Sequence, residues 1–199
     1  MNIQRDIELL FEISAFRHVQ RTWKRFLNPD VANCAEHTWR VVWTALTIAK
    51  HEGGVDQEKL LKMALMHDLA ESRTGDVDYI SRQYTQRDEE KAASDIFGGT
   101  IHQDEIELLN EYIKRESKEA KIVKDADNLD VELELLELEH KGHSLGAIWN
   151  KDRREVVYPK LFTETAKKMF DEIHQTNPHN WHLNGRNRIN AGDWKKSKV

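Results

Sequence analysis

The chain has 199 residues with 35 acidic and 30 basic side chains, and its net charge of −5 disfavours a general nucleic-acid-binding protein, which needs a basic face. Apolar residues make up 39% of the sequence, which is enough for a folded core and argues against disorder. The single cysteine, Cys34, excludes an internal disulfide framework and a zinc site built from cysteines. No apolar stretch approaches the roughly 20 residues that span a bilayer, and the start lacks the pattern of a secretory signal, so we expect a cytoplasmic protein.

Helices are expected throughout most of the chain, because prolines and glycines are rare and Leu, Glu, Lys and Ala are frequent. Apolar residues recur at helical spacing, as in Ile3, Ile7 and Leu10, and no short β-branched runs bounded by turns predict a sheet. The pattern predicts an all-α fold with helices over residues 3–16, 35–51, 56–71, 88–97, 103–115, 118–140 and 159–175. Asp56 is the expected N-cap of the third helix, and Pro159 is expected in the first turn of the last.

The segment after residue 176 differs in composition, because it is polar and contains the isolated tryptophans Trp181 and Trp194. We therefore expect a polar C-terminal extension over residues 177–199. The simplest interpretation is an irregular tail that packs its tryptophans on the helical body. The alternative is a tail that lines a pocket or contacts a second subunit, and a homodimer would provide such a surface.

Four candidate metal ligands lie on three of the predicted helices: His37, His67, Asp68 and Asp127. Imidazole and carboxylate groups suit divalent ions, and four of them leave an octahedral ion two positions for water or a substrate oxygen. Taken alone, His37 reads more readily as a core residue and Asp127 as a solvated carboxylate. However, the His67-Asp68 pair lies in the otherwise apolar segment KMALMHDLA. Because an unpartnered buried carboxylate is costly, a bound cation is the simplest explanation.

Two further carboxylates lie close to these ligands in the sequence. Glu71 is four residues after His67 and three after Asp68, so a continuous helix would place all three on one face. Glu71 could then reach a metal-bound water as a base or an orienting group. Gly75 permits a sharp helix exit, after which Asp76 could turn back toward the same water.

The order His37, then His67-Asp68, then Asp127 resembles the H…HD…D signature of the HD-domain metal-dependent phosphohydrolases. The segments EHTWRV, MHDLAESRTGD and AKIVKDADNLD are similar to those of the YfbR-type 5′-deoxynucleotidases and related small HD proteins, over about residues 10–140. The resemblance implies an all-helical HD domain over residues 1–176 whose four signature residues hold one divalent ion, with Mn, Co, Mg, Fe, Ni and Zn as the options.

The same resemblance implies an activity and roles for the neighbouring acids. Glu71 and Asp76 become the pair that handles the nucleophilic water and the leaving group. The implied reaction is the removal of phosphate from (deoxy)nucleoside 5′-monophosphates, so a small nucleotide is the expected partner and neither a membrane nor general nucleic acid is. The sequence lacks the prolines that often follow the Thr-Gly-Asp segment in these nucleotidases, so the loop over the nucleotide is expected to differ.

Substrate contacts are expected from three more residues. Family members carry an Arg followed closely by a Trp about 15 residues before the first signature His, and Arg21 and Trp23 lie 16 and 14 residues before His37. By resemblance, Arg21 would hold the phosphate and Trp23 would pack against the sugar or base. Lys124, three residues before Asp127, could also reach the phosphate. The alternative for these residues is a surface Arg, a core Trp and a solvated Lys.

Three other functions stay open at this point. One is a deoxynucleoside triphosphate triphosphohydrolase, which would release tripolyphosphate instead of phosphate. Another is a two-iron oxygenase, which needs additional His ligands between His67 and Asp127, where only His102 occurs. The third is a non-catalytic binding protein on the HD scaffold, which the complete ligand set disfavours.

Overall fold

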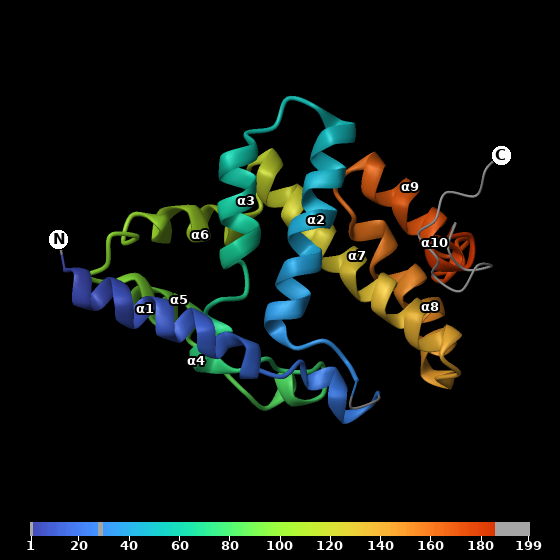
Figure 1. Cartoon of the computed structure of the whole chain (residues 1–199), viewed down its shortest axis with the longest axis horizontal. Coiled ribbons are helices and arrows are strands. Elements are labelled where there is room, and N and C mark those ends of the chain that lie inside the picture. Colours follow the sequence, from blue (N-terminus) through green and yellow to red (C-terminus); the bar gives the residue numbers. More distant parts are fainter. Residues whose placement is uncertain (1, 28–29, 186–199) are drawn as a thin grey trace, which may run out of the picture.

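The computed structural model describes residues 2–27 and 30–185 of the chain (Figure 1). Within these ranges the backbone forms helices, turns and one isolated bridge between Gln20 and Asn33, with no strand. The predicted all-α fold is therefore confirmed. The α-helices are α1 (Ile3–Ala15), α2 (Cys34–Glu52), α3 (Gln57–Met66), α4 (Glu71–Thr74), α5 (Glu89–Phe97), α6 (Glu105–Lys114), α7 (Lys118–His140), α8 (Ser144–Val156), α9 (Glu164–Ile173) and α10 (Asn180–Leu183).

Helix α7 runs through the middle of the fold and packs against α2, α3, α6, α8 and α9 (Figure 1). The core that these helices share is apolar, as helical spacing of Leu, Ile, Val and Ala requires. Fully buried side chains at its centre come from α2, α3, α7 and α9: Val41, Ile48, Leu60, Ile122, Leu129 and Phe170. The two longest helices, α2 and α7, thereby fix the relative positions of His37 and Asp127.

A second group of helices, α1, α4 and α5, lies together beside this core (Figure 1). Its apolar cluster includes Leu9, Phe16 and Ile96, and it also contains Cys34 from the start of α2. Arg5 ties α1 to α5 by donating to the carbonyl oxygens of residues 95, 96 and 98 at the end of α5. This second cluster supports the segment between α3 and α5, which carries Glu71 and Asp76.

The helix ends follow local rules that the sequence contains. Asn33 and Glu36 form a reciprocal capping box at the start of α2, and Gly53, with φ of 61°, ends that helix. Asp56 caps α3 by accepting from the Lys59 amide, as predicted. Ser117 caps α7 in the same way. As a result, α2 and α7 begin and end within one residue of the predicted bounds.

The predicted helix over residues 56–71 is wrong in its last turn. Helix α3 ends at Met66, and the chain continues through a tight turn in which the Leu69 and Glu71 amides bond to the carbonyls three residues earlier. Helix α4 then runs from Glu71 to Thr74, and Gly75 caps its end with φ of 73°. His67 and Asp68 therefore lie in a turn between two helices, not on one continuous helix face.

Two corrections concern the C-terminal half. Helix α8 over Ser144–Val156 is not predicted from the sequence, because its residues are mainly polar and include a glycine. The predicted helix over residues 159–175 begins later, at Glu164. Pro159 lies in a short 3₁₀ turn, and Asp125 accepts from the Phe162 and Thr163 amides, which holds the chain extended before Thr163 caps α9.

The described part of the C-terminal extension contains α10, where the Trp181 side chain is 82% exposed. The expected packing of Trp181 on the helical body is therefore wrong. Trp194 and residues 186–199 lie outside the described residues, and the homodimer stays a prediction. No helix in the described ranges combines the length and the apolar character needed to cross a membrane.

Candidate metal centre and cavity

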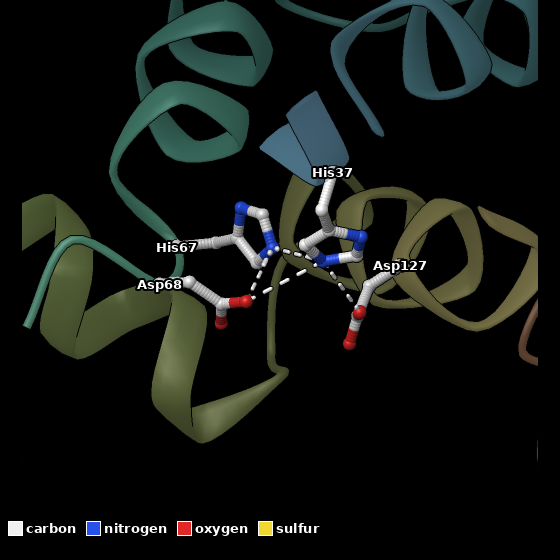
Figure 2. A group of neighbouring side chains, drawn as sticks. All are labelled: His37, His67, Asp68 and Asp127. Atoms are coloured by element: carbon white, nitrogen blue, oxygen red, sulfur yellow. Dashed lines mark hydrogen bonds and ion pairs between the residues drawn. The ribbon is translucent and has the colours of Figure 1, made fainter. Parts of the chain in front are cut away.

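Four side chains from three places in the fold converge on one point (Figure 2). His37 comes from α2, His67 and Asp68 from the turn after α3, and Asp127 from α7. One potential ligand atom from each lies within 4.8 Å of the others. The Nε2 atom of His37 is 3.2 Å from Asp127 Oδ1 and 3.4 Å from Asp68 Oδ2, while His67 Nε2 is 3.3 Å from His37 Nε2. The structure thus brings all four predicted ligands together.

Hydrogen bonds on the far side of each ring orient the two imidazoles. His67 Nδ1 lies 2.8 Å from the Ala64 carbonyl oxygen, which can only accept, so Nδ1 carries the hydrogen. His37 Nδ1 likewise donates to Asp130 Oδ2 over 2.6 Å. In its neutral form, each ring would then present the lone pair of Nε2 to the centre of the cluster. Two lone pairs and two carboxylates facing one point fit a divalent metal ion.

The electrostatics of the cluster also favour a bound positive charge. Burial and the charge of Arg21 oppose protonation of His37, but hydrogen bonds to Asp127, Asp130 and Asp68 outweigh them and raise its pKa well above the usual value. Burial favours the neutral form of Asp127, yet Lys124 and His37 hold the pKa of this carboxyl well below its usual range. The Asp127 carboxylate is therefore ionised and available as a ligand.

Glu71 lies beside the cluster and has a markedly perturbed acidity. Burial, followed by the charges of Asp68 and Asp76, raises the pKa of Glu71 to about 8. Its two carboxyl oxygens are held separately: Arg87 Nη1 donates to Oε1 over 2.9 Å, and the Cys34 thiol donates to Oε2 over 3.6 Å. Burial and the charge of Glu71 raise the pKa of Cys34, so this thiol is an unreactive neighbour.

Asp76 follows the helix exit at Gly75 and turns back toward the 21–23 segment. Its Oδ2 accepts from the Thr22 amide over 2.7 Å and from the Thr22 hydroxyl over 2.9 Å. The buried guanidinium of Arg21 lies between two carboxylates, with Nη1 3.6 Å from Asp68 Oδ2 and Nε 4.0 Å from Asp76 Oδ2. Arg21 therefore links the cluster to Asp76.

A cavity of about 350 Å³ opens over these groups, and most of its wall is charged. Seven residues of this wall are predicted from the sequence: Arg21, His67, Asp68, Glu71, Asp76, Lys124 and Asp127. The lining residues Arg82, Arg87, Tyr112 and Arg115 were not predicted. The missed arginines come from turns or loop segments, where no periodic pattern indicates which way a side chain points.

A family model described as "HD domain" matches residues 13–173 of the chain. The chain belongs to the HD-domain family. The four converging residues are those that carry the HD signature in the sequence. All four lie within the residues that this family model matches.

Proteins named 5′-deoxynucleotidase are among the relatives of the chain. The chain is 32% identical over 136 residues to the 5′-deoxynucleotidase HDDC2 of Danio rerio, with 64% of this chain and 66% of that protein covered. It is 30% identical over 123 residues to the protein of that name from Dictyostelium discoideum, with 56% and 65% covered. The chain thus spans just under two thirds of the length of these two relatives.

The fold has a counterpart among solved structures. A conserved hypothetical protein from Pyrococcus furiosus superposes with a TM-score of 0.68 at 25% sequence identity. The match covers 85% of this chain and 99% of that one. The helical arrangement around the site is therefore shared over nearly the whole of that protein.

A network of charged side chains that was not predicted from the sequence lies behind the four converging residues. Asp130, on α7, accepts from His37 and also from Arg40 Nε over 2.6 Å. Arg40 extends the network to Glu134, which accepts from the Ala32 amide over 2.7 Å. The sequence contains one indication that Asp130 lies near the cluster, because Asp130 follows Asp127 by three residues on the same helix.

Trp23 lies in an aromatic cluster, whereas the other predicted substrate contacts, Arg21 and Lys124, line the cavity. Its ring centroid is 5.1 Å from that of Trp149 on α8 and 6.3 Å from that of Tyr79, and Phe26 joins the same cluster. Trp23 does not line the 350 Å³ cavity of the HD domain. Its contact with a sugar or base stays a prediction.

Proposed function

We propose that this HD domain is a metal-dependent phosphomonoester hydrolase that removes phosphate from (deoxy)nucleoside 5′-monophosphates. The observation that carries the proposal is the convergence of two oriented imidazole nitrogens and two carboxylates, three of the four residues lying in the wall of a charged cavity. The similarity to proteins named 5′-deoxynucleotidase supports the substrate class.

The metal ligands in this proposal are His37, His67, Asp68 and Asp127. A divalent ion bound by them would lower the pKa of a coordinated water and offset charge on the phosphoryl group. The chain's own contribution is to orient the ligands, through the Ala64 carbonyl and Asp130, before the ion arrives. Such support keeps the ligand atoms in place without rearrangement on binding.

Glu71 and Asp76 are the proposed acid–base pair. Glu71 is fixed by Arg87 and Cys34 and has a pKa near the physiological range, which suits a group that gives and takes a proton. Asp76, fixed by two hydrogen bonds from Thr22, orients the attacking water. Together they would deprotonate the water and deliver a proton to the leaving alcohol.

Positive charge around the phosphate would come from two of the predicted residues. Arg21 lies 3.6 Å from Asp68, and Lys124 lies 2.6 Å from Asp127, so both cations are next to proposed metal ligands. Stabilising charge that develops on phosphoryl oxygens is the usual task of such side chains.

A hydrolysis screen tests the proposal. The full chain is stripped of metal with a chelator, supplied with Mn²⁺, Co²⁺ or Mg²⁺, and incubated with nucleoside 5′-mono- and 5′-triphosphates. We expect inorganic phosphate from the monophosphates, no release without metal, and recovery on readdition. Tripolyphosphate as the product would favour the triphosphohydrolase instead, and no release from any nucleotide would contradict the proposed function.

A further inference from the structure

The charges in the cavity wall divide into two groups. Each lining carboxylate pairs with one of three cations: Arg21 with Asp68 and Asp76, Arg87 with Glu71 and Glu89, and Lys124 with Asp127. The other two lining cations, Arg82 and Arg115, form no ion pair with any residue of the described ranges. Two guanidinium groups are therefore left to attract an anion into the cavity.

Arg115 is held at the cavity wall by an unusual local structure. It ends α6 in the left-handed conformation, with φ of 57°, and is the one non-glycine residue with positive φ in the described ranges. Such C-terminal positions usually carry glycine. The Arg115 guanidinium stacks on the Tyr112 ring, 3.4 Å from its centroid, and donates to the Tyr112 carbonyl. Stacking fixes the plane of the guanidinium without using an acidic partner.

Tyr112 also places this guanidinium close to the metal centre. The buried Tyr112 ring makes an edge contact with the His67 ring, their centroids 6.0 Å apart. Arg115 is therefore separated from one of the four cluster residues by a single aromatic ring. Arg82 lines the same cavity, and its side chain donates one hydrogen bond, to the Val77 carbonyl over 3.3 Å.

We propose that Arg115, together with Arg82, forms an additional phosphate-binding subsite that draws the nucleotide's anionic group into the cavity. Planar guanidinium groups bind phosphate oxygens in pairs, and these two have no carboxylate to release first. Arg21, in contrast, is buried between Asp68 and Asp76 and holds these two carboxylates in position. This inference rests on the proposed function for the identity of the anion, and it adds two cations without ion pairs to the paired cations Arg21 and Lys124.

The test uses the variant Arg115→Gly, because glycine suits the left-handed backbone and removes only the guanidinium. Lys114→Gln is the matched control, since it removes one positive charge from the neighbouring exposed residue outside the cavity. Arg82→Gln and the double variant complete the set. Binding of inorganic phosphate is measured by calorimetry on the Mn²⁺-loaded and on the chelator-treated full chain, and KM and kcat are measured with a nucleoside 5′-monophosphate.

We expect Arg115→Gly to keep or raise the melting temperature while phosphate affinity falls at least about tenfold, the loss typical of one bond to a charged group. The KM of Arg115→Gly should rise by a similar factor with little change in kcat. Adding Arg82→Gln in the double variant should weaken phosphate binding further. Lys114→Gln should bind phosphate as the wild type does. Phosphate affinity within twofold of the wild type in Arg115→Gly, or no phosphate binding by the wild type, would overturn the inference. A chain that binds phosphate through Arg115 but hydrolyses no phosphomonoester would instead contradict the proposed function alone.

Discussion

His37 Nδ1 donates a hydrogen bond to Asp130 Oδ2 over 2.6 Å, and each of the two residues is only 1% exposed. This contact sets which imidazole nitrogen faces the cluster, and it links α2 to α7 behind the four converging residues. Arg40 neutralises the second oxygen of Asp130 over 2.6 Å, so the carboxylate stays ionised in a buried place. Its pKa is lowered because these contacts outweigh burial.

Asp130→Ala should therefore weaken metal binding while leaving the four ligands in place. Loss of such a supporting carboxylate typically costs about 10–100-fold in metal affinity. Competition with a chelator would measure the dissociation constant for Mn²⁺. Asp125→Asn provides a control on the same helix, because Asp125 holds the Phe162 and Thr163 amides and should affect stability instead of metal affinity. Unchanged affinity in Asp130→Ala would show that the hydrogen bond plays no part in the metal site.

The proposed ligands themselves give a second prediction. Asp68→Ala or His67→Ala should abolish nucleotide hydrolysis and bound metal while the helical content measured by circular dichroism stays close to the wild-type value. The reason is that each substitution removes one ligand but leaves the apolar core of α2, α3 and α7 intact. Asp152→Ala, an exposed carboxylate on α8, is the control. Substantial metal-dependent hydrolysis by Asp68→Ala would contradict the ligand assignment.

Glu71 is expected to lower the stability of the metal-free protein at neutral pH. Its pKa of about 8 in the fold exceeds the ordinary value of 4.5, so the folded state binds the proton more tightly than the unfolded state. Stability from this group is therefore full below pH 4.5 and decreases as the pH rises toward 8. Glu71→Gln should raise the free energy of unfolding by a few kcal/mol at pH 8, with a smaller gain near pH 5.

Urea denaturation of the chelator-treated protein at several pH values would measure this difference. Glu90→Gln on the exposed face of α5 changes the same charge without burial and should show no such trend. A stability difference for Glu71→Gln that stays constant between pH 5 and 8 would mean that Glu71 titrates normally in the fold.

Helical periodicity and the order of the signature residues were sufficient to predict the all-α fold and the four residues that converge. They were sufficient because α2 and α7 are long, capped by local sequence and joined through apolar faces. Arg87 and Arg115 were not predictable, since one lies before α5 and the other takes a left-handed conformation at the end of α6. Only the folded chain shows which cations share a cavity.

Helix α8 was not predicted from the sequence, in part because it contains a glycine that packs closely on α7. Its sequence contains Gly146, which normally weakens a helix, yet here the glycine lets α8 approach α7 closely. A Cβ atom at this position would lie 2.8 Å from the Leu135 carbonyl oxygen and 2.9 Å from Glu139 Cβ. Tertiary packing thus outweighs the local preference against a helix.

Gly146→Ala should accordingly destabilise the protein, although alanine is the better helix former by about 1 kcal/mol. Both contacts are tighter than real Cβ atoms tolerate, and one is to backbone, so α8 must shift away from α7 at a cost of about 1–3 kcal/mol. Because Trp149 lies one turn further along α8 and packs on Trp23, the shift should also change tryptophan fluorescence. Ala147→Gly on the exposed side of α8 is the control, and should cost only its helix propensity of about 1 kcal/mol. If Gly146→Ala instead stabilised the chain in urea denaturation, the close approach of α8 to α7 would not exist in solution.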